Sequence, residues 1–264
     1  MKLKFRFSVD DNIWFLKDIA NNNYKSIFEN EYLNFYKYLH DTYNVKIQFN
    51  IFYCTEGFNL SQMTDSYKEE WNKNSDWLKL SFHSLQEDPS KPYEFSGREE
   101  VRNDCQTVQN EIIRFAGAES LNLYTTLHWA VATKDGCLGL KDCGIKGLIG
   151  LFGRTDNLGL SYHLSKDISL YLQNHLYYKD DETSLLFFNN DMVINNTKLK
   201  DIPILLEAKV GKEFIEIMIH EQYFYKTYFA YQKDFKEKVI AAISFLKNNG
   251  YQSVFLDEIA DNNL

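Results

Sequence analysis

The sequence predicts an α/β protein built around a parallel β-sheet, wound either open or closed into a barrel. Strand-like runs alternate with helix-like runs along most of the 264 residues, and repeated β–α units of this kind produce parallel sheets. The length is ordinary for one α/β barrel. Only three prolines occur and no linker or low-complexity tract interrupts the chain, so we expect residues 1–264 to form a single domain.

The first half of the chain begins with its clearest element. Within residues 3–9 apolar side chains alternate with polar ones, which is the period of a β-strand. The next elements are expected to be a helix from about residue 13, a helix over 28–40, a strand at 45–53, a helix around 63–72 and a strand at 77–82. A long helix over about 97–115 follows, since Val108, Ile112 and Phe115 fall on one helical face.

The second half continues the alternation with one interruption. The expected elements are a strand at 123–129, a helix at 133–143, a strand at 145–151, a strand at 214–219, a helix at 235–248 and a strand at 252–256. Asn249 and Gly250 form a helix stop before the last strand. The stretch from about 156 to 212 departs from the pattern, and its short strand-like runs predict a small β-rich insertion.

Charge and composition narrow the choice of partners. The net charge is −8 and no basic stripe is present, which argues against a nucleic-acid partner because phosphate binding requires clustered Lys and Arg. No apolar run is long enough to cross a bilayer and no signal peptide precedes the first strand, so we expect a cytoplasmic protein without a membrane partner. The four cysteines are too few and too scattered for a disulfide framework. The sequence leaves the oligomeric state open.

Ionisable side chains gather at the predicted strand ends. The first strand ends in Asp10 and Asp11, and three later strands end in His83, His128 and His220. In a parallel barrel the carboxyl ends of the strands share one face, where active sites are built. Two adjacent carboxylates repel each other unless a cation or a shared proton absorbs the charge. An alternative role for Asp11 is to cap the helix that begins near residue 13.

This set of side chains suits metal-dependent hydrolysis. Oxygen and nitrogen ligands from Asp and His match zinc or another first-row divalent ion, which polarises a carbonyl and brings the pKa of water toward roughly 7. A free carboxylate can then take the proton of the water, and a histidine opposite can protonate the leaving group. The sequence has no Gly-x-Ser-x-Gly elbow, P-loop or dinucleotide-binding glycine motif, so serine hydrolase, kinase and dinucleotide-binding functions lack support.

In order and strand context, three motifs resemble those of the polysaccharide deacetylase family, the NodB-homology carbohydrate esterases. Residues 8–11 (Ser-Val-Asp-Asp) are similar to the family's Thr-Phe-Asp-Asp at the end of the first barrel strand. His83 and the serine after it match the start of the second motif, whereas Glu87 stands where the family has a second His. The strand ending at His220, the helix that follows and the Gly-Tyr at 250–251 resemble the last motif.

The resemblance implies a distorted (β/α) barrel of seven strands and a metal-dependent hydrolase that removes an acyl group, such as acetyl, from an N- or O-acylated carbohydrate. It implies that Asp10 is the general base and His220 the general acid. Asp11 and His83 are the implied metal ligands, joined by Glu87 if its carboxylate replaces the missing His. The implied ion is Zn²⁺, with Co²⁺, Ni²⁺ or Mn²⁺ as alternatives.

The departures from the family pattern leave alternatives open. His128 competes with Glu87 for the third ligand position, because it ends a neighbouring strand. Otherwise His128 and Trp129 are expected to bind the substrate, with the Trp129 ring stacked on a sugar face. Alternative functions are a barrel that has lost catalysis and only binds carbohydrate, a deacylase of a small amide, and a glycan-cleaving hydrolase that pairs Asp10 with Glu87 or Glu221.

Overall fold

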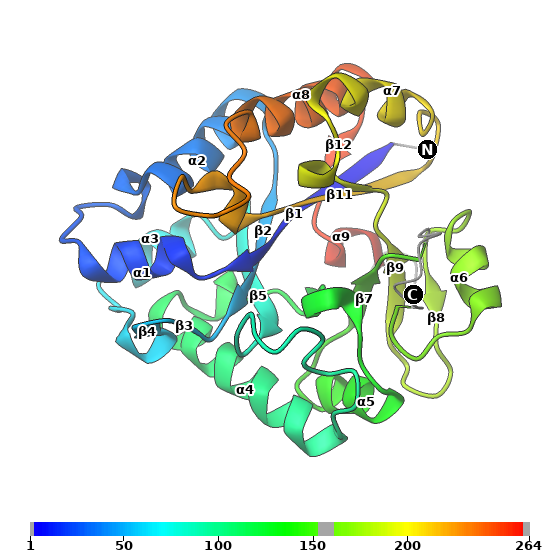
Figure 1. Ribbon diagram of the computed structural model, residues 1–264, viewed down its shortest axis with the longest axis horizontal. Helices are drawn as coiled ribbons and strands as arrows, with labels where there is room; N and C mark the ends of the chain where they lie inside the picture. The colour runs from blue at the N-terminus through cyan, green and yellow to red at the C-terminus, as the bar shows by residue number, and fades with distance from the viewer. Residues whose placement is uncertain (1–2, 153–160, 261–264) are drawn as a thin grey trace.

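The computed structural model describes residues 3–152 and 161–260, with strands in the centre and helices around them (Figure 1). The helices are α1 (Trp14–Asn21), α2 (Glu31–Tyr43), α3 (Lys68–Lys73), α4 (Arg98–Phe115), α5 (Lys134–Asp142), α6 (Lys166–Leu172), α7 (Ile202–Glu207), α8 (Phe235–Asn248) and α9 (Asp257–Ala260). The longer strands are β1 (Lys4–Asn12), β2 (Ile47–Phe52), β5 (Leu78–Ser84), β7 (Gly147–Gly150), β9 (Leu186–Asn189) and β11 (Phe214–His220). The two-residue strands are β3 (Cys54–Thr55), β4 (Phe58–Asn59), β6 (Tyr124–Thr125), β8 (Tyr178–Lys179), β10 (Met192–Val193) and β12 (Gln252–Ser253).

The strands form two principal sheets. The larger sheet has the order β10-β11-β1-β2-β5, with β12 added at the start of β1, and all its pairings are parallel. The second sheet has the order β6-β7-β9-β8 and is parallel except for the β8–β9 pair. Strands β3 and β4 form a separate antiparallel hairpin. The predicted parallel α/β fold is therefore confirmed.

The two sheets adjoin along both edges. A single parallel bridge between Leu80 and Leu121 links β5 to the segment that leads into β6. At the other edge the chain passes from β9 to β10 through Asn190 and Asp191. These contacts bring the sheets together without a continuous ladder of strands, so the seven-stranded barrel, like the single domain over 1–264, stays a prediction.

The region predicted to be an insertion contributes strands to both sheets. Within its described part, β9 pairs in parallel with β7 and β10 pairs in parallel with β11. The start of the predicted insertion, residues 156–160, lies outside the described residues. The sequence did not reveal this arrangement because strands of two to four residues are too short to show a clear period.

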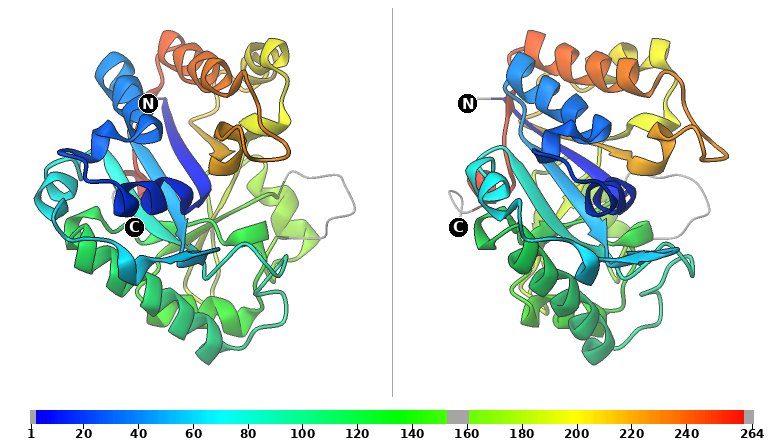
Figure 2. Two further views of the ribbon diagram at one scale, coloured as in Figure 1. Left: turned by 60° about the vertical axis from the view of Figure 1, so that its left-hand side comes forward. Right: turned by 90° about the vertical axis from the view of Figure 1, so that its left-hand side faces the viewer.

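The two faces of β1 carry different kinds of side chain. Phe5, Phe7 and Val9 belong to the apolar core that the surrounding helices cover, while Arg6 and Ser8 are buried on the opposite face among polar groups. Helices α2 and α8 lie on one side of the strands of the larger sheet, and α4 lies on the other side (Figure 2). Of the described helices, none combines the length and the apolar character needed to span a membrane.

Candidate metal centre and active site

A β-bulge at the end of β1 directs two adjacent carboxylates into the same cavity. Side chains of neighbouring residues point to opposite faces of a regular strand. Here the pairing of β1 with β2 shifts register between Val9 and Asn12, and Asp11 has a φ of 61°, a conformation that Asp adopts more readily than most residues. Asn12 holds the bulge by donating to the Val9 carbonyl at 2.6 Å and the Asn50 carbonyl at 3.0 Å. Asp10 and Asp11 both line the cavity as a result.

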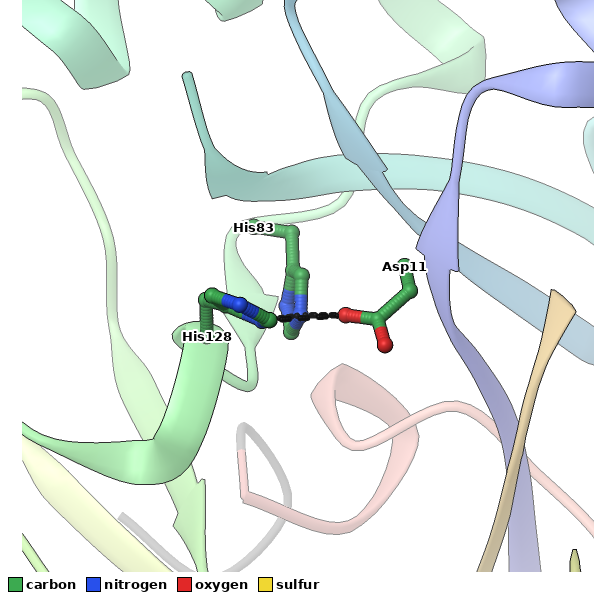
Figure 3. Close-up of side chains that lie close together, drawn as sticks. All are labelled: Asp11, His83 and His128. Atoms are coloured by element: carbon green, nitrogen blue, oxygen red, sulfur yellow. Dashed lines mark hydrogen bonds and ion pairs between the residues drawn. The ribbon is translucent and has the colours of Figure 1, made fainter. Parts of the chain in front are cut away.

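Asp11, His83 and His128 converge in this cavity, from β1, from β5 and from the turn after β6 (Figure 3). Asp11 Oδ1 lies 2.9 Å from His83 Nε2 and 3.0 Å from His128 Nδ1. The two ring nitrogens are 3.3 Å apart, and all three residues are buried. Ligand atoms of a tetrahedral zinc ion with bonds of 2.0–2.1 Å are about 3.3 Å apart. The three atoms are therefore spaced much like neighbouring ligands of one metal ion.

Backbone carbonyls fix which ring nitrogens face this group. His83 Nδ1 donates to the Thr126 carbonyl, and His128 Nε2 donates to the Glu87 carbonyl at 3.0 Å. Because a carbonyl only accepts, these two nitrogens carry protons, so in a neutral ring His83 Nε2 and His128 Nδ1 are the nitrogens that offer a lone pair. Either a proton on a ring nitrogen or a metal ion joins these nitrogens to the Asp11 carboxylate, and carbonyls orient metal-binding histidines in this way. The donor set fits a divalent metal ion.

The pKa values of these groups reflect the same convergence. Burial raises the pKa of the Asp11 carboxyl, but the charge of His220 and hydrogen bonds from two further histidines hold it well below its usual range. Burial lowers the pKa of His83, but its hydrogen bond to the Asp11 carboxylate and the charges of Asp10 and Asp11 raise it overall. Asp11 therefore stays ionised, and the site attracts a proton or a metal ion.

Asp10 and His220 flank the cluster from neighbouring strands, as register partners in the β1–β11 ladder. His220 Nδ1 lies 2.9 Å from Asn195 Oδ1, while the Asn195 amide nitrogen donates to Asn196. His220 Nδ1 consequently carries a proton, and Nε2 lies 4.0 Å from Asp11 Oδ2. This nitrogen is in position to hold or release a proton beside the cluster.

A chain of amides fixes the carboxylate of Asp10. Asn50 donates to Asp10 Oδ1 at 2.6 Å, and its own oxygen accepts from Gln48 at 2.7 Å. Gln48 also donates to the Tyr124 carbonyl at 2.7 Å. Since the Asn50 oxygen faces Gln48, its nitrogen faces Asp10. Burial raises the pKa of Asp10, although two histidines and Asn50 lower it, which makes this carboxylate a better proton acceptor than a free one. Sequence reasoning missed Asn50, whose only signal was its place among apolar residues of a strand.

Glu87 lies in a different place from the one predicted for it. Its main-chain carbonyl orients His128, and its exposed side chain lines the cavity outside the group of three. Side chains four residues apart meet on a helix, but the chain after β5 has no helix before α4. Residues 83 and 87 therefore do not face one another, and His128 approaches His83 instead.

Glu221 caps a helix from a distant strand. Its carboxylate accepts from the backbone N–H groups of Ile13 at 2.6 Å, Trp14 at 2.9 Å and Phe15 at 2.7 Å, and from the Tyr225 hydroxyl at 3.0 Å. Burial raises the pKa of Glu221 to about 7, against the lowering effect of these bonds. Both oxygens are engaged, so Glu221 anchors the start of α1 and is not free to act as a catalytic carboxylate.

The cavity above the cluster has a volume of about 940 Å³, within the roughly 300–1,000 Å³ of ligand pockets. Trp129 lies on its lining with 45% of its surface exposed. The backbone has positive φ at Trp129 (65°) and at Ala130 (53°), which costs on the order of 1 kcal/mol for a residue other than glycine. This turn presents an indole ring at the cavity.

Comparison with solved structures identifies the fold. Agd3, described as a carbohydrate deacetylase, has a TM-score of 0.60 at 8% identity, over 99% of this chain and 53% of that one. The BA3943 protein of Bacillus anthracis, described as a CE4 family pseudoenzyme, has a TM-score of 0.51 at 10% identity, over 96% of this chain and 63% of that one.

The chain has the fold of the carbohydrate deacetylases. The resemblance drawn from the sequence motifs is thereby confirmed at the level of fold. A 4-alpha-glucanotransferase from Thermococcus litoralis shares it, with a TM-score of 0.59 at 10% identity over 98% of this chain and 38% of that one, so the fold alone does not fix the reaction. No protein-family model matches the sequence, and no curated protein does.

Proposed function

We propose that the protein is a metal-dependent hydrolase that removes an acyl group, such as acetyl, from an N- or O-acylated carbohydrate. The convergence of Asp11, His83 and His128, with Asp10 and His220 beside them, supports this function above all. In this proposal His128 takes the third ligand position, for which the sequence left Glu87 and His128 as competing candidates. A divalent ion held there, Zn²⁺ or a similar metal, supplies Lewis acidity, because it polarises a carbonyl oxygen and acidifies water.

The flanking side chains perform the proton transfers. Asp10, held by Asn50, takes a proton from the water that attacks the acyl carbon. His220, whose Nδ1 is held by Asn195, gives a proton from Nε2 to the leaving nitrogen or oxygen as the bond to the acyl group breaks. The products are a carboxylic acid and a free amine or hydroxyl. Trp129 offers its exposed ring to a sugar face at the cavity.

The arrangement disfavours the glycan-cleaving alternative. That reaction needs two free carboxyl groups on either side of the scissile bond. Of the two partners considered for Asp10, Glu221 is engaged by three backbone N–H groups and is not available, which leaves only Glu87 at the cavity for that reaction. The spacing of Asp11 Oδ1, His83 Nε2 and His128 Nδ1 supports a metal-binding protein over a barrel that only binds carbohydrate.

The test is acetate release from acetylated amino sugars and acetylated oligosaccharides. Protein stripped with a chelator and refilled with zinc, cobalt, nickel or manganese is expected to gain this activity. Asp10→Asn and His220→Ala are each expected to lower kcat by about 10²–10⁴-fold, while a surface variant, Glu237→Ala, keeps it. Turnover that persists in both active-site variants means that the proposed proton transfers are wrong.

A further inference from the structure

The run Asn189, Asn190 and Asp191 ends β9 and is left unused by the proposed chemistry. Asn190 is 7% exposed, and neither its amide oxygen nor its amide nitrogen has a hydrogen-bond partner among residues 3–152 and 161–260. Asn189 Oδ1 lacks a partner as well. Buried polar side chains almost always find partners in native proteins, so an amide with both ends free requires an explanation.

The backbone holds Asn190 firmly in the cavity wall. Its N–H donates to the Gly150 carbonyl at 2.8 Å, and the N–H of Asp191 donates to the Glu216 carbonyl at 2.9 Å. These bonds attach the segment to β7 on one side and to β11 on the other. The side-chain amide of Asn190 is therefore held in place by the backbone of a strand end, and Asp10 and His220 lie at strand ends as well.

Asn190 belongs to two adjoining cavities. It lines the cavity of about 940 Å³ together with Asp10 and His220. It also lines a second cavity of about 390 Å³, whose lining includes Gln173 and Asn174 but none of Asp11, His83 and His128. A single hexose is smaller than the drug-sized molecules that fill pockets of roughly 300–1,000 Å³. The combined space has room for more than the unit that carries the acyl group.

Asp191 cannot be the group that binds a ligand there. Its carboxylate accepts from Lys212 Nζ at 2.7 and 2.8 Å, from Lys209 Nζ at 3.3 Å and from the Glu216 backbone at 3.1 Å. Among the described residues that line both cavities, Asn190 is the polar one whose side chain is left without a partner.

The chemistry of a primary amide indicates what Asn190 binds. Its oxygen accepts and its adjacent nitrogen donates two hydrogen bonds, which complements neighbouring hydroxyl groups on a sugar ring, since each hydroxyl both donates and accepts. We propose that Asn190 forms a second recognition site, which binds the hydroxyl groups of a sugar unit adjacent to the acylated one. This inference rests on the proposed function in taking the ligand to be a carbohydrate.

The test is calorimetric binding to the whole, metal-free chain, so that turnover does not interfere. The probes are N-acetylglucosamine and its β-1,4-linked disaccharide. The wild type is expected to bind the disaccharide at least tenfold more tightly than the monosaccharide. Asn190→Leu is expected to lose at least tenfold in affinity for the disaccharide and to keep its affinity for the monosaccharide.

The matched control is Gln109→Leu. Gln109 is also buried, with an unpartnered amide nitrogen, but it lies on α4 away from both cavities. Both leucine variants remove an unpaired buried amide, so neither is expected to lower the melting temperature, and Gln109→Leu is expected to bind both sugars like the wild type. If Asn190→Leu does not fold, Asn190→Ser serves in its place.

The outcomes separate this inference from the proposed function. Equal binding of the disaccharide by wild type and Asn190→Leu overturns the second site and leaves the hydrolase standing. The protein could instead bind the disaccharide more tightly than the monosaccharide, lose that preference in Asn190→Leu, and release no acetate from any substrate. This result supports the second site and overturns the hydrolase. A wild type that binds neither sugar, or binds both equally, overturns the second site.

Discussion

Replacing Glu221 with alanine should destabilise the start of α1, because a single carboxylate serves three backbone donors there. The Ile13, Trp14 and Phe15 N–H groups lose their acceptor, and each buried donor left unpaired costs about 1–3 kcal/mol. The removal of a buried carboxylate offsets part of this cost, since the rise of its pKa from 4.5 to about 7 corresponds to about 3 kcal/mol. The three donors together cost about 3–9 kcal/mol, which leaves a net loss of about 0–6 kcal/mol. Within this range we expect about 3–5 kcal/mol, the usual cost of removing one partner of a buried charged interaction.

The assay is urea unfolding at pH 8 in the presence of a chelator, so that Glu221 is ionised and metal binding does not contribute. Glu221→Gln keeps one oxygen and is expected to lose about half as much stability as Glu221→Ala. Hydrogen exchange should show that the amides of residues 13–15 open first in both variants. Glu237→Ala, an exposed change in the first turn of α8, is expected to stay within about 0.5 kcal/mol of the wild type. A Glu221→Ala protein within 1 kcal/mol of the wild type refutes the capping role.

Two further predictions concern buried groups below the site. Burial raises the pKa of Glu216 to about 8, although Arg6 lowers it; the native state therefore binds this proton more tightly than the unfolded state, whose pKa is about 4.5. The contribution of this proton to the free energy of unfolding is expected to be fully present below about pH 4.5 and to decline by up to about 1.4 kcal/mol per pH unit as the pH rises to about 8. In urea unfolding at several pH values, Glu216→Gln should remove this part of the pH dependence. An unchanged pH dependence in the variant contradicts the prediction. Asn50→Leu removes the hydrogen-bond donor that lowers the pKa of Asp10, so the acid limb of the pH–rate profile should move to higher pH. The same change should lower kcat by about 10–100-fold. An unmoved acid limb means that Asn50 does not position Asp10.

The sequence predicted the fold class and the strand-end residues because both follow from local pattern. The alternation within β1 and the apolar runs of β5 and β11 identify the strands, and parallel pairing brings Asp11, His83 and His220 to one edge. The order of the motifs around Asp10 then indicated deacetylase-like chemistry, and the solved structures confirm the likeness of fold.

Other features depend on contacts that no local pattern encodes. The bulge held by Asn12 comes from how β1 pairs with β2, and Glu221 caps a helix 206 to 208 residues earlier in the chain. Glu87 was placed by the spacing of a sequence motif, but the chain after β5 forms no helix before α4 that would bring residues 83 and 87 to one face. His128 reaches the cluster through a turn after β6, a strand of two residues whose end the sequence could locate only approximately.

Zinc affinity of the His128 and Glu87 variants tests the metal centre most directly. The measurement is a competition titration of the stripped protein against a chromophoric chelator at pH 7.5, for wild type, His128→Ala and Glu87→Gln. Loss of a residue that only supports a metal ligand lowers metal affinity by about 10–100-fold, and loss of a ligand itself should lower it further. We therefore expect His128→Ala to bind zinc at least about 100-fold more weakly than the wild type. Glu87→Gln keeps the main-chain carbonyl that orients His128, so its zinc affinity should stay close to that of the wild type. Zinc binding that survives in His128→Ala but fails in Glu87→Gln contradicts the assignment of Asp11, His83 and His128 as the metal site.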